Sequence, residues 1–517
     1  MFAFCIQQCA FVKTTMSFTS FLAQRVANLA RRKIKANAQE ALSNQVATMH
    51  ELVAVAKNTA FGIDKDFESI TDYESFKSKV PVNDYEGSKE YFDRIADGEE
   101  NVCWPGKPLY LAKTSGTTSG TKYIPITKDS IGNHINSARN ALLEYIALSK
   151  KPNFIDGKVM FLSGSPRLDK KAGIFTGRLS GISNHHIPSY LKRKQLPSWT
   201  TNCLEDWEEK VRKIAEETHG ADLRLISGIP PWVQMYFDLI QEKSNGQTML
   251  EVFPNLQLFV YGGVNFEPYK QKLFQSIGRE IDSIETYPAS EGFIAYQDDY
   301  RSPGLRLLTE DGIFFEFIKA DEYHNEDPTR VWLKDVQLNV NYAVIINSNA
   351  GLWGYSIGDT VKFSSLNPYK LLVTGRIKHF ISAFGEHVIG EEVEHALMTT
   401  LKETNYKIIE FTVAPQVSPA NGLPYHEWFI SFENVPEAAD LELLAQKIDR
   451  ALQTKNSYYK DLITGSVLRT LVITPLQSNA FIEYMKEEGK LGGQNKVPRL
   501  ANDRKIADRI AHYSIRL

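Results

Sequence analysis

Between residues 158 and 286, short apolar runs typical of buried strands alternate with longer segments that have the periodicity of amphipathic helices. The four strand candidates cover residues 158–163, 223–227, 256–261 and 281–286. The three helical segments between them cover residues 205–218, 231–242 and 267–278. Strands separated by helices predict a parallel sheet with helices packed on it. This stretch therefore places the chain in the α/β class.

From residue 312 the pattern changes to strands without intervening helices, at 313–318, 343–347, 361–363 and 370–374. We expect an antiparallel β subdomain joined to the large α/β body. Beyond it the predicted order is a helix (390–403), two strands (407–414 and 426–432), a helix (439–453) and a strand (468–474). This order predicts a small α+β lid domain with one antiparallel sheet. We divide the chain into domains at 1–376 and 377–517, with a helical stretch at 20–60 preceding the body.

Composition excludes several classes of protein. The 517 residues carry a formal net charge of −3, with no general basic excess for nucleic acid. The sequence has no run of about 18 uncharged apolar residues, so we expect no membrane span. Four cysteines are too few for a disulfide framework and are typical of a reducing compartment. We expect a cytoplasmic monomer that binds neither nucleic acid nor membranes.

The first fifteen residues need a separate interpretation. Residues 1–12 are mostly apolar, but they lack the basic start and the small-residue cleavage site of a secretory signal. Met16-Ser17-Phe18 has the form of a more ordinary start. We therefore interpret residues 1–15 as a leader that arises from an upstream start codon.

The segment 113–122 reads KTSGTTSGTK, and apolar residues precede and follow it. Backbone amides, hydroxyl groups and an ammonium in such a loop can converge on phosphate oxygens. A flexible surface linker has a similar composition and is the alternative. Its spacing is not that of a P-loop, because three residues separate Gly116 from Gly120 and Thr121 precedes Lys122. No G-x-G-x-x-G follows a strand candidate, which disfavours a dinucleotide-binding protein or a kinase.

Two further motifs follow strand candidates. YPASEG at 287–292 offers a tyrosine ring for a base and a carboxylate, Glu291, that can hold Mg²⁺; a polar turn is the alternative. Tyr261-Gly262-Gly263 ends another strand, where a ring of a ligand could lie against bare backbone.

Three more motifs complete the set. In GYSIGD at 354–359, Asp359 on a rigid turn could accept hydrogen bonds from both ribose hydroxyls, although such Gly-Asp pairs are usually ordinary turns. In VTGRIK at 373–378, Arg376 and Lys378 could contact a nucleotide from a hinge. The run 489–499, GKLGGQNKVPR, could present a lysine on a mobile loop, and a solvated loop is the alternative.

In this order, the motifs resemble those of the adenylate-forming superfamily, and most closely the GH3 family of acyl acid amido synthetases, particularly its bacterial members. The resemblance extends over residues 17–515. It implies a fold with a large N-terminal body and a small C-terminal lid, the cofactors ATP and Mg²⁺, and two substrates, a small carboxylic acid and an amine such as an amino acid. It also implies a reaction in two steps, formation of an acyl-adenylate and transfer of the acyl group to the amine.

The resemblance also implies roles for individual residues. The ATP phosphate loop would comprise Ser115, Gly116, Thr117, Thr118, Ser119, Gly120 and Lys122. The nucleotide site would further include Gly262, Gly263, Tyr287 at the adenine, Ser290 at a phosphate, Glu291 at Mg²⁺, Asp359 at the ribose, and Arg376 and Lys378 at the hinge. Lys496 would be the lid-borne lysine that acts during adenylation together with Glu291 and Lys122, and Lys490 is the second candidate for that lysine.

Some features depart from the pattern or leave alternatives open. Ser356 stands where plant relatives have arginine, and the segment 120–125 is shorter, so the plant hormone substrates do not transfer to this chain. A carboxylate–CoA ligase remains an alternative, although the sequence shows no clear basic surface for the 3′-phosphate of CoA. A non-catalytic nucleotide-binding paralogue is another. We expect the acid pocket between the 131–146 helix, the 173–190 segment and the pair Trp232 and Tyr236, although core packing is the commoner fate of such aromatic residues.

Overall fold

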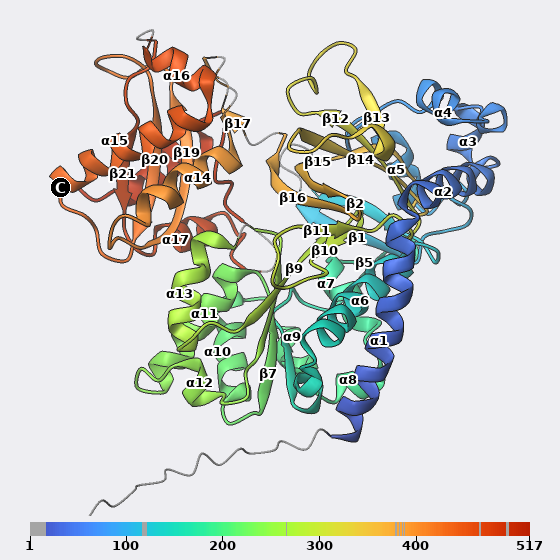
Figure 1. Cartoon of the computed structure of the whole chain (residues 1–517), viewed down its shortest axis with the longest axis horizontal. Coiled ribbons are helices and arrows are strands. Elements are labelled where there is room, and N and C mark those ends of the chain that lie inside the picture. The colour runs from blue at the N-terminus through green and yellow to red at the C-terminus, as the bar shows by residue number, and fades with distance from the viewer. Residues whose placement is uncertain are drawn as a thin grey trace, which may run out of the picture.

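A computed structural model describes residues 17–115, 121–264, 266–377, 380–381, 383–384, 386, 388–464, 467–492 and 496–516. Within these ranges, no helix is both long enough and apolar enough to cross a bilayer. Figure 1 shows two parts side by side, a large N-terminal body and a smaller C-terminal domain. The predicted α/β class is confirmed.

One twelve-stranded sheet runs through the N-terminal body, in the order β13-β12-β14-β15-β16-β11-β10-β9-β8-β7-β3-β6. Its parallel half consists of β3 (Lys158–Phe161), β6 (Gln195–Leu196), β7 (Leu223–Ser227), β8 (Leu258–Gly262) and β9 (Asp282–Ala289). Its antiparallel half consists of β10 (Gly292–Tyr296), β11 (Leu305–Leu307), β12 (Ile313–Lys319), β13 (Arg330–Trp332), β14 (Asn341–Ser348), β15 (Leu352–Leu366) and β16 (Tyr369–Arg376). The expected antiparallel strands are therefore present, and they continue the parallel sheet through the β9–β10 hairpin.

Helices cover both faces of the parallel half because alternate strand residues point to opposite sides. Met160, Ile226 and Phe259 pack in one cluster with α10 (Trp207–Thr218), α11 (Pro230–Lys243) and α13 (Glu267–Ile277). Val159, Leu225 and Leu258 pack in another with α1 (Phe18–Gln39) and α6 (Ile131–Ser149). The helix expected over 20–60 is two helices, because the chain turns at Glu40 before α2 (Ala41–Ala56).

A four-stranded sheet, which the sequence did not predict, lies beside the main one. It contains β1 (Tyr110–Ser115), β2 (Thr121–Ile126), β4 (Asp169–Lys171) and β5 (Ile174–Gly177), in the order β2-β1-β5-β4. The body also contains short α-helices: α3 (Ala60–Asp64), α4 (Tyr73–Lys79), α5 (Lys89–Ala96), α7 (Leu179–His185), α8 (Ser189–Lys192), α9 (Trp199–Asn202) and α12 (Met249–Val252).

The C-terminal domain has its own core, in which the buried Phe411 and Trp428 rings stack. Its elements are β17 (Phe380–Ile381), β18 (Val388–Ile389), α14 (Gly390–Leu401), β19 (Ile408–Gln416), β20 (Tyr425–Phe432), α15 (Ala438–Lys455), α16 (Ser457–Thr464), β21 (Val472–Leu476), α17 (Ala480–Glu487) and α18 (Lys505–Ile510). The prediction of a wholly antiparallel sheet is wrong. β21 runs parallel to β20 because α15 forms a crossover between them. The boundary expected at residue 376 coincides with the end of β16, and its position stays a prediction.

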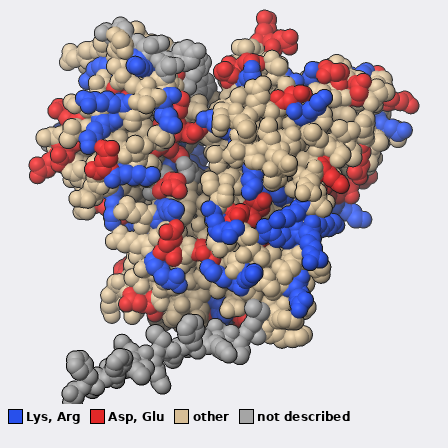
Figure 2. Space-filling model, viewed as in Figure 1, with Lys and Arg blue, Asp and Glu red and all other residues tan. Residues whose placement is uncertain are grey.

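Charged side chains are mixed over most of the face drawn in Figure 2. A group of basic side chains gathers near α1, which has Arg and Lys residues but no acidic residue. The surface charge of this face is therefore distributed, with one local basic region.

Candidate active site

The hairpin between β9 and β10 presents the predicted acidic residue. Ala289 pairs with Gly292, so Ser290 and Glu291 form the connection between the two strands. This turn lies at the carboxyl end of a parallel strand, where ligands of open α/β sheets commonly bind. Glu291 is therefore placed at the edge of the sheet where a ligand is expected.

Asp359 is held by two neighbours. The hydroxyl of Tyr287 donates a hydrogen bond of 2.7 Å to its Oδ2, and Nε of Arg376 lies 2.7 Å from its Oδ1. Asp359 was expected on a turn, but it lies within β15, directly opposite Arg376 on β16. Gly358, with a φ of 79°, precedes it and allows the strand to bend there. The pairing of β15 with β16, rather than a turn, therefore orients the carboxylate of Asp359.

The electrostatic surroundings join Glu291 to the same site. Burial raises the pKa of Glu291, whereas the charges of Arg376 and Lys122 lower it. The hydroxyl of Tyr355 also lies beside this carboxylate; burial and the nearby Glu291 raise the pKa of that tyrosine. A partly desolvated carboxylate gains from any additional cation. The ammonium of Lys122, which is on β2, lies 5.2 Å from the centre of the Tyr85 ring.

Lys496 reaches this site from the C-terminal domain. Its ammonium donates a hydrogen bond to the carbonyl of Gly263, directly after β8. Although the side chain retains solvent-exposed surface, desolvation of its ammonium lowers its pKa to about 8. Asp359 opposes the shift and Arg376 adds to it. Lys490 instead lies 3.3 Å from the carboxylate of Glu488 in its own domain, so the geometry favours Lys496.

The remaining predicted residues divide into two groups. Gly262 ends β8 so close to β9 that a Cβ atom there would lie 2.3 Å from the carbonyl oxygen of Thr286, and Gly263 has a φ of 83°. Ser115 ends β1 opposite Thr121, which brings together the two ends of the proposed phosphate loop. The loop residues Gly116, Thr117, Thr118, Ser119 and Gly120, and also Lys378, lie outside the described residues.

A magnesium ion fits this donor set in one particular way. In the described part of the chain, no group of three or more His, Cys, Asp or Glu side chains could enclose a metal. Mg²⁺ commonly takes only one or two carboxylates from the protein and its other ligands from phosphates and water. Glu291, with its raised pKa and its place beside Lys122, fits this mode of binding.

Sequence reasoning missed two features of the site and misplaced a third. It did not identify Tyr355 beside Glu291, although this residue opens the Tyr-x-x-Gly-Asp motif, or the pairing of Arg376 with Asp359. Trp232 and Tyr236 were expected in the acid pocket, but both are buried in the core under the sheet.

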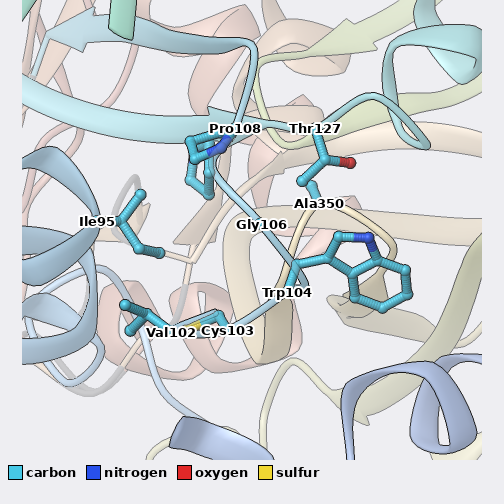
Figure 3. Close-up of a pocket in the computed structure, with 9 residues that line it drawn as sticks. Ile95, Val102, Cys103, Trp104, Gly106, Pro108, Thr127 and Ala350 are labelled. Carbon is cyan, nitrogen blue, oxygen red and sulfur yellow. The ribbon is translucent and has the colours of Figure 1, made fainter. Parts of the chain in front are cut away.

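The 173–190 segment does line a groove of about 490 Å³, which comprises Tyr110, Pro166, Arg167, Leu168, Asp169, Phe175, His185 and Trp199. The cavity in Figure 3 is different, since its volume is only about 10 Å³ and Ile95, Val102 and Trp104 are among its lining residues. A space of that size holds one water molecule at most. The groove, and not this cavity, is large enough for a small organic molecule.

The chain is also similar in sequence to known proteins. The 29% identical indole-3-acetic acid-amido synthetase GH3.15 of Arabidopsis thaliana matches over 367 residues, which are 56% of this chain and 60% of the relative. A jasmonoyl–L-amino acid synthetase of Nicotiana attenuata, JAR4, is 23% identical over 57% of this chain and 62% of its own length. These matches thus span about three-fifths of the relatives.

The solved structures support the fold. A GH3.15 acyl acid amido synthetase has a TM-score of 0.77 at 16% identity, covering 95% of this chain and 97% of the other. A 2-hydroxyisobutyryl-CoA ligase has a TM-score of 0.60 at 11% identity, covering 90% of each chain. Both share the fold described above, a large N-terminal body followed by a C-terminal domain.

Family models agree with both comparisons. The GH3 family N-terminal domain matches residues 30–202, the GH3 family central domain matches 306–376, and the GH3 family C-terminal domain matches 391–505. The three domains occur in order along one chain, and they include Asp359, Arg376 and Lys496. The resemblance noted in the sequence is confirmed: the chain belongs to the GH3 family.

Proposed function

We propose that this protein is an AMP-forming ligase that joins a small carboxylic acid to an amine, most simply an amino acid. One observation carries the proposal: Asp359, Glu291 and Lys496 converge from separate elements at the carboxyl edge of the sheet. The names of the GH3 relatives support it, since one describes a jasmonoyl–L-amino acid synthetase and another an indole-3-acetic acid-amido synthetase. A non-catalytic paralogue would be expected to lose one of these three residues.

In the first step, an oxygen of the substrate carboxylate attacks the α-phosphorus of ATP. The bond from that phosphorus to pyrophosphate breaks, and an acyl-adenylate forms. The protein needs to position the reactants and to neutralise charge, because no covalent enzyme intermediate is required. Asp359 accepts hydrogen bonds from the ribose hydroxyls, and the 115–120 segment donates hydrogen bonds to the phosphates. Lys496 brings its ammonium to the developing negative charge.

Glu291 and Lys122 serve the phosphates. Glu291 would hold Mg²⁺, which would supply positive charge at the phosphate oxygens. Lys122 adds a cation at the start of β2, after the proposed phosphate loop. The ring of Tyr287 is proposed to contact adenine, while its hydroxyl keeps the Asp359 carboxylate oriented.

In the second step, the amine nitrogen attacks the acyl carbon, the carbon–oxygen bond to AMP breaks, and the nitrogen loses a proton. While the domains hold the orientation of the first step, they shield the mixed anhydride from water, which would otherwise hydrolyse it. We propose a cytoplasmic location and a monomeric state. The buried free thiols of Cys103 and Cys203 support the reducing location.

ATP–pyrophosphate exchange across a panel of carboxylic acids tests the first step. Exchange should require both ATP and one of the acids, and a panel without any acid-dependent exchange would contradict adenylation. Mass spectrometry with amino acids or CoA as acceptor then tests the second step. An amide together with AMP is the expected product, whereas a CoA thioester without amide would favour the ligase alternative.

A further inference from the structure

A buried polar cluster connects the two domains at α13. Tyr269, on this helix, donates a hydrogen bond of 2.6 Å to Oε2 of Glu410 on β19. Its oxygen also accepts one of 2.5 Å from Nη2 of Arg499. The guanidinium lies 5.0 Å from the centre of the Tyr269 ring, within cation–π range. The Tyr269 hydroxyl thus both donates and accepts a hydrogen bond across the interface.

The C-terminal domain forms the receiving pocket largely by itself. Arg499 pairs with Glu394 of α14 at 2.9 Å and lies 3.6 Å from Glu410. The cluster is well shielded from solvent, since 7% of Tyr269 and 12% of the Arg499 side chain are exposed. Tyr269 is the residue by which the N-terminal body enters this pocket.

The same pocket is mechanically connected to Lys496. Three residues after that lysine, the carbonyl of Arg499 accepts a hydrogen bond from Val413 of β19, and Ala501 donates back to Val413. The hydroxyl of Thr412 also donates to the carbonyl of Pro498, at 2.6 Å. The segment that carries Lys496 is therefore attached to β19, and Tyr269 attaches both of them to the body.

We propose that Tyr269 is a positioning residue that holds the C-terminal domain in the orientation in which Lys496 reaches the nucleotide site. The proposal rests on the proposed function for its effect on catalysis. When the lid moves away, water can form the hydrogen bonds that Tyr269, Glu410 and Arg499 lose, so the contact is reversible. Replacing Tyr269 with phenylalanine removes the hydroxyl, so that a shielded oxygen of Glu410 has no donor from Tyr269 when the domains are together. The resulting destabilisation applies only to this orientation of the domains.

Other contacts across the interface provide a matched comparison. Lys272 of α13 lies 3.4 Å from Glu433, and Lys486 of α17 pairs with Glu208 of α10 at 2.6 Å. These pairs are more exposed than the Tyr269 cluster, and exposed ion pairs contribute little. The buried phenol should therefore influence domain orientation more than either lysine does.

The test compares Y269F with K272A in two rate measurements. Y269F should slow acid-dependent pyrophosphate exchange by roughly 10- to 100-fold, the factor expected for one unsatisfied buried polar group. It should leave the reaction of a supplied acyl-adenylate with the amine within about twofold, because that step does not need Lys496 at the nucleotide site. K272A should change neither rate by more than about twofold. Equal losses in both steps for Y269F, or no loss of exchange, would overturn the proposal.

The rate of crosslinking between the two domains tests the positioning role of Tyr269 without relying on the proposed enzymatic activity. Cysteines introduced as K272C and E433C should be crosslinked by a short bifunctional thiol reagent, with each single variant as a control. Adding Y269F should slow that crosslinking, whereas an unchanged rate would overturn the proposal. Absence of exchange activity in the unsubstituted protein, with crosslinking still slowed by Y269F, would refute the proposed function and leave the positioning role standing.

A double-mutant cycle identifies the partner. If Tyr269 acts through Glu410, the effects of Y269F and E410Q on crosslinking should be clearly less than additive. Additive effects would show that the hydroxyl does not act through this carboxylate. Far-ultraviolet circular dichroism and thermal unfolding of each variant check that the fold is intact.

Discussion

Replacing Asp359 with asparagine tests the nucleotide site at its best-defined point. Each carboxylate oxygen already takes one donor, Oδ2 from Tyr287 and Oδ1 from Arg376. One acceptor position therefore remains on each oxygen for a ribose hydroxyl. Asparagine has almost the same shape, but it loses the negative charge and one of these acceptors.

The expected size of the effect follows from that loss. One hydrogen bond to a charged acceptor contributes about 1.5–3 kcal/mol, so ATP should bind roughly 10- to 100-fold more weakly. The fold should tolerate the change, because 53% of the Arg376 side chain is exposed and the lost ion pair should cost about 1 kcal/mol or less. Arg376 also keeps its hydrogen bond to the carbonyl of Ile357.

Calorimetric titration with ATP and the KM for ATP in pyrophosphate exchange both measure this effect. Y287F is the matched control, since it removes the donor to Asp359 and leaves both acceptors in place, so its loss of affinity should be smaller. Thermal unfolding checks that D359N is folded. A folded D359N that binds ATP as tightly as the unsubstituted protein would refute the assignment of Asp359 to the ribose.

Three further predictions concern other charged groups. The kcat/KM for ATP should fall as the pH rises through about 8, where Lys496 loses its proton, and K496R should move this fall to higher pH; an identical profile in K496R would contradict the assignment. E291Q should raise the Mg²⁺ concentration for half-maximal exchange roughly tenfold, and unchanged Mg²⁺ dependence would remove Glu291 from that role. Burial raises the pKa of Glu144 to about 7 despite Arg31, so ionisation destabilises the folded state as the pH rises from about 4.5 to 7. E144Q should therefore increase the free energy of unfolding at pH 8 by up to about 3 kcal/mol and have little effect near pH 4, as chemical denaturation would show; an equal effect at both pH values would contradict this account.

Local patterns in the sequence predicted much of this fold. Alternating strands and helices between 158 and 286 appear as β3, β7, β8 and β9 with their covering helices, because burial on a two-sided sheet imposes that pattern on each segment. The motifs around Glu291 and Asp359 could also be identified, since each is contained within a few residues. Their positions along the chain carried the resemblance to the family.

Pairings between distant segments could not be predicted in the same way. β1 pairs with β5 across an interval of some sixty residues, and no local signal encodes that choice. Tyr269 and Arg499 are 230 residues apart, and although Arg499 ends the 489–499 run, nothing in that run indicates Tyr269 as its partner. Asp359 was assigned to a turn because Gly-Asp favours turns, whereas pairing with Arg376 on β16 keeps it in a strand. Tertiary contacts decided these features.

Oxygen transfer from the acid to AMP tests the central claim most directly. With an acid that supports exchange, labelled with ¹⁸O in its carboxylate, and with an accepted amine, attack on the α-phosphorus predicts one labelled oxygen in each AMP. Mass spectrometry of the AMP and of the amide measures this transfer. The predicted result is ¹⁸O-labelled AMP in the same molar amount as the amide. Unlabelled AMP, or label in inorganic phosphate with formation of ADP, would contradict an acyl-adenylate.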